Sequence, residues 1–119
     1  MDRQDRINKE VNYVGNTLHL NFSAAMLTYK MKPSDQNIIA ISDQADAAAI
    51  LTLPSIAEAC GKFYYICSPT GAAAGDISIY EKETGAELTT YGDHDADDDW
   101  VILYSDGRKW RNVAITGVA

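Results

Sequence analysis

The stretch Trp100-Val-Ile-Leu-Tyr-Ser-Asp-Gly-Arg-Lys-Trp110 predicts a β-hairpin and contains both tryptophans of the chain. Asp106-Gly107 is a strong turn signal, because glycine adopts positive φ without a Cβ clash and aspartate tolerates it. If these two residues form the loop, the hairpin has Trp100, Ile102, Tyr104 and Val113 on one face and Val101, Leu103 and Trp110 on the other. Both faces are then apolar, so each must be covered by the same domain or by another copy of the chain.

Several other segments also predict short strands. Leu18, Leu20 and Phe22 alternate with polar residues in 17–22, and residues 37–42 are rich in β-branched side chains. Further strands are expected at 50–53, 62–67 and 76–80, with a weak one through 89–91. Residues 24–32 fit either a short helix or a strand, and 43–49 fit a helical turn. The pattern predicts an all-β fold, a small antiparallel sandwich or a barrel-like module.

One helical turn is expected directly after Pro54. Ser55 is a candidate N-cap, Glu58 lies three residues later where it can return the hydrogen bond, and Gly61 lies where the helix would end.

Length and charge limit the classes of function. A chain of 119 residues fits one domain, with a polar N-terminal arm at 1–16 and a β domain at 17–119. The net charge of −7 argues against nucleic acid and against an anionic membrane surface. Residues 1–32 hold five basic and three acidic residues, whereas the remainder holds five basic and fourteen acidic ones. The start has no apolar segment for export, so we expect synthesis in a cytoplasm.

The acidic segment 93–99 is a candidate cation site. Asp93, Asp95 and Asp97 have the spacing of the first three ligands of a calcium loop. Asp98 occupies the position that needs glycine, however, and Tyr104 occupies that of the bidentate glutamate. The segment therefore predicts a solvated acidic tip rather than a metal site.

Catalysis and cofactor binding are not expected. The only histidines, His19 and His94, have no recognisable partner motif, and the sequence has no phosphate-binding loop or zinc motif. Cys60 and Cys67 are expected to be reduced structural residues.

Two segments together resemble a β module of bacteriophage virion proteins. Residues 50–66 match a "TLTLP" strand followed by "A-x-x-x-G-K-x-Y-x-I", and residues 101–110 match a closing "V-x-L-x-S-D-G-x-x-W" hairpin. The resemblance covers about 50–113. Two features depart from the pattern, which usually has a small residue in place of Cys60 and a less charged segment before Trp100.

The resemblance implies a structural role. Such modules occur in capsid decoration (cement) proteins, head fibres and tail fibres, and they are usually trimeric. We therefore expect a decoration protein on the outer surface of the capsid, with other copies of itself and the major capsid protein as partners. A head- or tail-fibre domain that binds a host-surface receptor or glycan is the alternative. The expected trimer interface or core consists of Trp100, Ile102, Tyr104, Trp110 and Val113, and a monomeric sandwich in which the hairpin is simply the central strand pair stays open.

The N-terminal arm is the expected capsid contact. An extended arm covers more of an assembled shell than a compact body does. Its basic side chains could pair with acidic groups of the shell while apolar side chains anchor it, and an ordinary frayed terminus is the alternative. The residues proposed for this contact are Arg3, Arg6, Ile7, Lys9, Val11, Tyr13 and Val14.

Overall fold

The computed structural model describes residues 10–23, 26–42, 49–68, 77–88, 93–94 and 99–116. These residues form ten strands: β1 (Val11–Val14), β2 (Thr17–Phe22), β3 (Thr28–Lys30), β4 (Asn37–Ser42), β5 (Ala49–Thr52), β6 (Phe63–Ser68), β7 (Ile77–Tyr80), β8 (Asp93–His94), β9 (Asp99–Ser105) and β10 (Trp110–Thr116). The predicted all-β class is confirmed. In the described part of the chain, no helix is long and apolar enough to cross a membrane.

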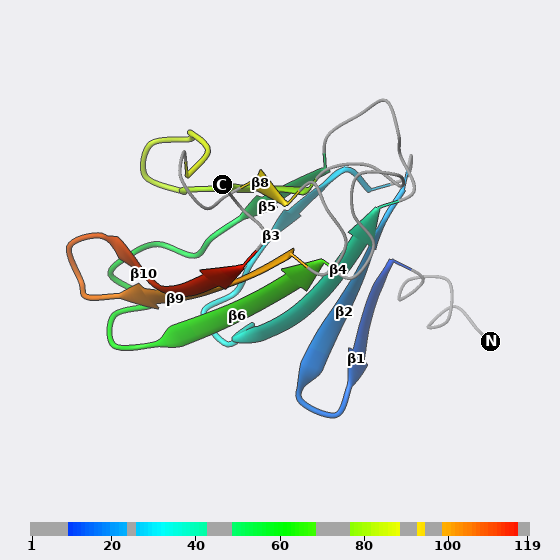
Figure 1. Cartoon of the computed structure of the whole chain (residues 1–119), viewed down its shortest axis with the longest axis horizontal. Helices are drawn as coiled ribbons and strands as arrows, with labels where there is room; N and C mark the ends of the chain where they lie inside the picture. The colour runs from blue at the N-terminus through cyan, green and yellow to red at the C-terminus, as the bar shows by residue number, and fades with distance from the viewer. Residues whose placement is uncertain are drawn as a thin grey trace.

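The strands form two sheets that lie one above the other (Figure 1). The large sheet has six strands in the order β1-β2-β4-β6-β9-β10, and the second sheet has four in the order β3-β5-β7-β8. From β2 to β7 the chain alternates between the sheets, so that each strand of one sheet is followed by a strand of the other.

This alternation makes the prediction of antiparallel sheets wrong in part. Strands β2, β4 and β6 are parallel to one another, and so are β3, β5 and β7. Parallel neighbours need a crossover connection, and here a strand of the opposite sheet takes the place of the usual helix. Antiparallel pairing occurs at the ends, in β1–β2, β6–β9, β9–β10 and β7–β8.

The core lies between the two sheets. The large sheet contributes alternate residues such as Leu18, Leu20 and Ile38, and the second sheet contributes Leu51 and Ile79, none of them more than 1% exposed. The period of two explains this pattern, because successive side chains of a strand point to opposite faces. Strand β2 spans Thr17–Phe22 with inward Leu18, Leu20 and Phe22, as its alternation predicts.

The sheet begins earlier than predicted, because the end of the supposed arm is a strand. Strand β1 pairs with β2 through Val11 and Leu20 and through Val14 and Thr17. Gly15, with φ of 62°, forms the turn between the two strands. Residues 11–16 therefore belong to the β domain, and residues 1–9 lie outside the described part of the chain.

The segments of ambiguous prediction are partly resolved. The candidate helix or strand at 24–32 contains strand β3, and β5 begins at Ala49. The candidate helical turn at 43–49 is wrong at Ala49, which begins β5, and its other residues and the weak strand at 89–91 lie outside the described residues.

The cap predicted at Ser55 is present. The Glu58 amide donates a hydrogen bond of 3.1 Å to Ser55 Oγ, and the Ser55 hydroxyl donates one of 3.0 Å to Glu58 Oε1. The Ala59 amide bonds the Ser55 carbonyl at 3.0 Å, and Gly61 ends the turn with φ of 82°. This turn places residues 55–61 beside the β9–β10 hairpin.

Candidate interaction surface

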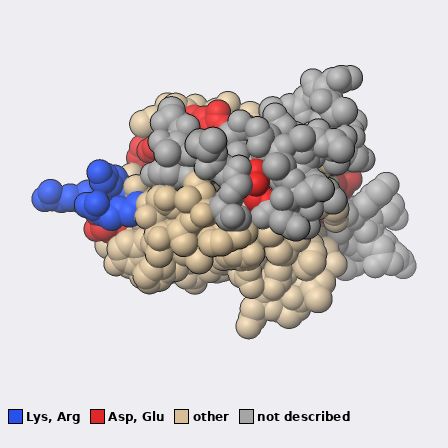
Figure 2. Space-filling model, viewed as in Figure 1, with Lys and Arg blue, Asp and Glu red and all other residues tan. Residues whose placement is uncertain are grey.

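The outer face of the large sheet is the leading candidate for an interaction surface. Its three central strands β4, β6 and β9 carry no charged side chain at their outward positions. In Figure 2 the part of the molecule that carries the large sheet is mostly uncharged, whereas Lys and Arg side chains gather at one end. We call this surface the outer face; it consists of Asn37, Ile39, Ile41, Phe63, Tyr65, Cys67, Trp100, Ile102 and Tyr104.

Aromatic side chains on neighbouring strands are in contact across the outer face. The ring centroids of Phe63 and Tyr104, which are paired residues of β6 and β9, lie 4.6 Å apart. The rings of Tyr65 and Trp100 lie 6.2 Å apart. Phe63 is nevertheless 52% exposed. Cross-strand aromatic pairs stabilise the sheet, and here they also leave Phe63 in contact with solvent, whereas Tyr65, Trp100 and Tyr104 are half-buried.

The hairpin residues predicted for a trimer interface or core fall into three environments. Trp110 is 4% exposed and belongs to the core, where its ring meets Tyr64 edge-on at 5.5 Å. Trp100, Ile102 and Tyr104 are half-buried and lie together on one face of β9, as the alternation predicts. Val113 is 52% exposed and lies at a β-bulge between Asn112 and Ala114.

The predicted two-residue loop is wrong, and the β-bulge, which the sequence analysis does not predict, accounts for the misplacement of Val113. Ser105 pairs with Trp110, so the loop consists of the four residues Asp106–Lys109. The predicted register is therefore shifted, and the bulge shifts it again between Asn112 and Ala114. Trp110 still lies on the face of Val101 and Leu103, since it pairs with buried Ser105.

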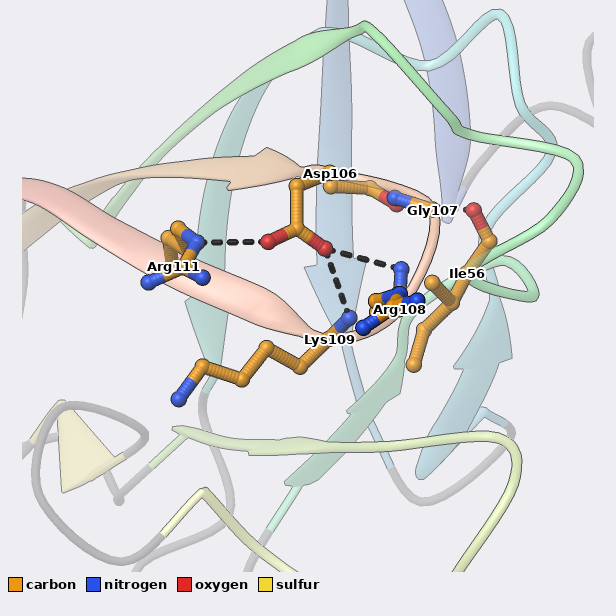
Figure 3. A network of polar contacts seen from close by, with 7 residues as sticks. Ile56, Asp106, Gly107, Arg108, Lys109 and Arg111 are labelled. Carbon is orange, nitrogen blue, oxygen red and sulfur yellow. Dashed lines mark hydrogen bonds and ion pairs between the residues drawn. The ribbon is translucent and has the colours of Figure 1, made fainter.

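Asp106 organises this loop (Figure 3). Its Oδ1 accepts hydrogen bonds from the amides of Arg108 at 2.8 Å and Lys109 at 2.9 Å, and its Oδ2 accepts one from Arg111 Nε at 2.5 Å. These bonds favour the carboxylate form, so they lower the pKa of Asp106 to about 2, the Lys109 and Arg108 amides being the larger causes. The loop thus holds two basic residues, Arg108 and Lys109, and Arg111 of β10 lies beside it.

The two segments that carry the family resemblance meet at the base of this loop. The Gly61 amide donates to the Ser105 carbonyl at 2.8 Å, and the Ser105 hydroxyl donates to the Ile56 carbonyl at 2.7 Å. Gly107 has φ of 89°, and a Cβ at this position would lie 2.9 Å from Cys60 Sγ. The "G-K" and "S-D-G" residues of the pattern therefore have a structural role: they attach the hairpin to the turn at 55–61.

The described residues of the predicted arm are part of the sheet. Val11 packs against the core, Tyr13 is 50% exposed and Val14 is 57% exposed. Arg3, Arg6, Ile7 and Lys9 lie outside the described residues.

A buried carboxylate, which the sequence analysis missed, joins β1 to the rest of the fold. Asp35 is 2% exposed, and it accepts hydrogen bonds from the Tyr13 hydroxyl at 2.7 Å, the Tyr29 hydroxyl at 2.9 Å and the Lys32 amide at 2.9 Å. The hydrogen bond to Asp35 raises the pKa of Tyr13, and desolvation followed by the bond to Asp35 raises that of Tyr29. Asp35 follows Pro33-Ser34, a turn signal that gives no indication of burial.

The remaining candidate chemical groups do not form a site within the described residues. Cys60 and Cys67 are free thiols. In the acidic segment, Asp93 and His94 form β8, and residues 95–98 lie outside the described part. Asp99 is buried at the start of β9, so the prediction of a solvated tip is wrong for this residue. Among the described residues, no group of three or more His, Cys, Asp or Glu side chains is arranged to hold a metal ion.

Comparisons with known proteins give no further assignment. The chain matches no protein-family model, no curated protein and no solved structure.

Proposed function

We propose that the chain is a structural protein of a bacteriophage virion, a decoration protein that binds the assembled capsid as a homotrimer and stabilises it. It would be made in the host cytoplasm and located on the outer surface of the capsid, with the major capsid protein as its second partner. The proposal comes from the resemblance of residues 50–66 and 101–110 to phage β modules. It needs no catalytic group and no cofactor.

The uncharged outer face is the observation that supports the proposed trimer. Interfaces between permanently associated subunits are rich in aromatic and aliphatic side chains and poor in charge at their centre. Phe63, Tyr65, Trp100, Ile102 and Tyr104 lie at the middle of the sheet, and Arg111 lies beside Tyr104 toward the edge. Three copies arranged around an axis would each direct this face inward, which would remove the exposed parts of these apolar side chains from water.

The capsid contact would use the other parts of the surface. Residues 1–9, which include Arg3, Arg6, Ile7 and Lys9, remain the proposed anchor to the shell, and Val14 extends this anchor along an exposed edge strand. Val11 is assigned to the fold instead, because it packs against the core.

Light scattering after size exclusion tests the trimer. The wild-type chain should have the mass of three copies at micromolar concentration, whereas Ile102→Lys should yield folded monomers, because it places a charge at the centre of the outer face. Thr28→Lys is the matched control, since Thr28 is exposed on the second sheet, and it should remain trimeric. A wild-type monomer would refute the trimer.

Mass spectrometry of purified phage particles tests the virion role. Particles from a lysate of the phage or lysogen that carries the gene should contain the chain in a fixed ratio to the shell protein. Its absence from intact particles would refute the decoration role even if the trimer is correct.

A further inference from the structure

A cavity of about 350 Å³ lies on the second sheet, away from the outer face of the large sheet. It opens where the carboxyl ends of β3, β5 and β7 meet. Parallel pairing places Lys30 of β3 beside Thr52 of β5, and Thr52 beside Tyr80 of β7. These three side chains therefore lie in a row along one side of the cavity.

The frame of the cavity is held by backbone hydrogen bonds and by an apolar base. The Met31 amide donates to the Thr52 carbonyl at 2.8 Å, and the Leu53 amide donates to the Tyr80 carbonyl at 2.9 Å. Met31 is 5% exposed and Leu53 is 1% exposed. Because its base belongs to the core, the cavity exists before any ligand binds, which lowers the entropic cost of binding.

The rim of the cavity has equal numbers of positively and negatively charged side chains. Lys30 and Lys82 supply ammonium donors, whereas Glu58 and Glu81 supply carboxylate acceptors. Lys82 Nζ and Glu58 Oε1 lie 4.0 Å apart, which is longer than a hydrogen bond, and both side chains are more than half exposed. Donors and acceptors on both sides of the rim thus remain available to a ligand.

We propose that this cavity binds a neutral, hydroxyl-rich ligand, namely one sugar unit. A hydroxyl group both donates and accepts, so neighbouring hydroxyls of a sugar match ammonium and carboxylate groups together. The ring of Tyr80 and the apolar base suit the carbon-bound hydrogens of a sugar ring, and the volume is at the lower end of the range for small-molecule sites. An anion would meet two carboxylates and a cation two ammonium groups, so a charged ligand fits less well.

This inference does not depend on the proposed virion function, but the two are compatible. The cavity lies on the second sheet, so it would stay open to solvent if the outer face of the large sheet were buried between copies. A sugar unit would be presented either as a free saccharide or as part of a surface polysaccharide.

Amide chemical-shift perturbation of the full chain tests the site. The probes are glucose, galactose, N-acetylglucosamine and lactose at millimolar concentrations, with acetate and methylammonium as charged comparators and a soluble dextran as the polymeric source. At least one neutral sugar should shift the amides of Thr52, Tyr80 and Lys82 in a saturable way. A response to dextran alone would identify a polymer as the source, and a response to a free sugar would identify the single unit.

Two variants and one control make the test specific. Lys82→Ala should weaken binding about tenfold, the effect of losing one charge-assisted hydrogen bond. Tyr80→Phe should keep the ring and bind within a few-fold of wild type, and Lys109→Ala, at the distant hairpin loop, should bind as wild type does. The proposal is overturned if no neutral sugar shifts these amides, if acetate or methylammonium binds there more tightly, or if Lys82→Ala has no effect.

Discussion

Replacement of Trp110 by alanine is expected to lower the free energy of unfolding by about 3 to 5 kcal/mol, the usual cost of removing a large aromatic side chain from a core. Trp110 is 4% exposed, and its ring meets that of Tyr64 edge-on at 5.5 Å, a contact that contributes about 0.5 to 1.5 kcal/mol beyond burial. Tyr64 cannot easily move into the space, because its hydroxyl donates to the Pro33 carbonyl at 2.6 Å. The loss should therefore fall in the upper half of the range.

Urea unfolding at several protein concentrations measures this effect, with Trp100→Ala as the matched control. Each variant retains one tryptophan as a fluorescence probe. The loss caused by Trp110→Ala should be the same at every concentration, because that side chain is buried within a single copy. The loss caused by Trp100→Ala should increase with protein concentration, because the outer face is fully buried only when copies associate.

Two results would contradict this reasoning. A loss below about 1 kcal/mol for Trp110→Ala would mean that the hairpin does not close the core. A loss for Trp100→Ala that is independent of concentration would show that Trp100 contributes only within one copy, and it would remove the argument for an interface on the outer face.

Four further predictions concern the loop, the buried carboxylate and the N-terminus. Gly107→Ala should cost about 1 to 3 kcal/mol, because it combines a positive φ with a close approach to Cys60, and adding Cys60→Ala should recover part of the loss in thermal melts. The pKa of Asp106 is lowered from 3.8 to about 2, so its stabilising effect is fully present above about pH 5 and is lost as the pH falls toward 2. In urea unfolding, the difference in stability between wild type and Asp106→Asn should therefore shrink over that pH interval. A constant difference would refute the assignment. Asp35→Asn should lower the pKa of both Tyr13 and Tyr29, because the hydrogen bond to Asp35 and its charge raise both. The pKa of Tyr29 should stay above its ordinary value, since desolvation is its first cause. An alkaline titration of tyrosinate absorbance in single Tyr→Phe backgrounds measures both, and an unchanged pKa for either tyrosine would refute the assignment. Deletion of residues 1–9 should leave the melting temperature nearly unchanged while weakening capsid binding. Deletion of residues 1–14 should lower the melting temperature, because it removes β1 and its bond to Asp35. Undiminished decoration of empty capsids after the shorter deletion would exclude the arm as the anchor.

The features that the sequence predicts are those determined by neighbouring residues. The alternation in 17–22 gives both the strand and its buried face, and the Ser55–Glu58 pair gives the cap with the correct partners. Strand β1 has a local signal as well, since Gly15-Asn16 lies between two alternating segments. The signal is weak, because residues 11–14 form only a short strand after a charged segment.

Strand direction and neighbours cannot be predicted in the same way. A strand such as residues 37–42 has the same alternation whether it pairs in a parallel or an antiparallel manner, so the mixed sheet had no local signal. The alternation places Trp100, Ile102 and Tyr104 on one face of the hairpin. It does not predict that β6 pairs with β9, and so it does not place Phe63 and Tyr65 beside them. The sequence places Val113 opposite Trp100 because it gives no local signal for the bulge between Asn112 and Ala114. The loop length is also not a local property, since Ser105 at the base of the loop bonds Ile56 and Gly61, which are distant in sequence.

Because the chain alternates between two sheets, the number of strands in each sheet and the distance between the sheets can vary independently. Each circuit from the large sheet to the second sheet and back adds one strand to both sheets, so a circuit could be inserted or removed without changing the distance between the layers. In the large sheet this series of parallel strands ends where the pairing becomes antiparallel, at β1–β2 on one side and at β6–β9 on the other. The β1–β2 and β9–β10 hairpins therefore lie at the two ends of this series of crossovers. A relative with the same hairpins and one more crossover between them would have a wider apolar face on the same architecture.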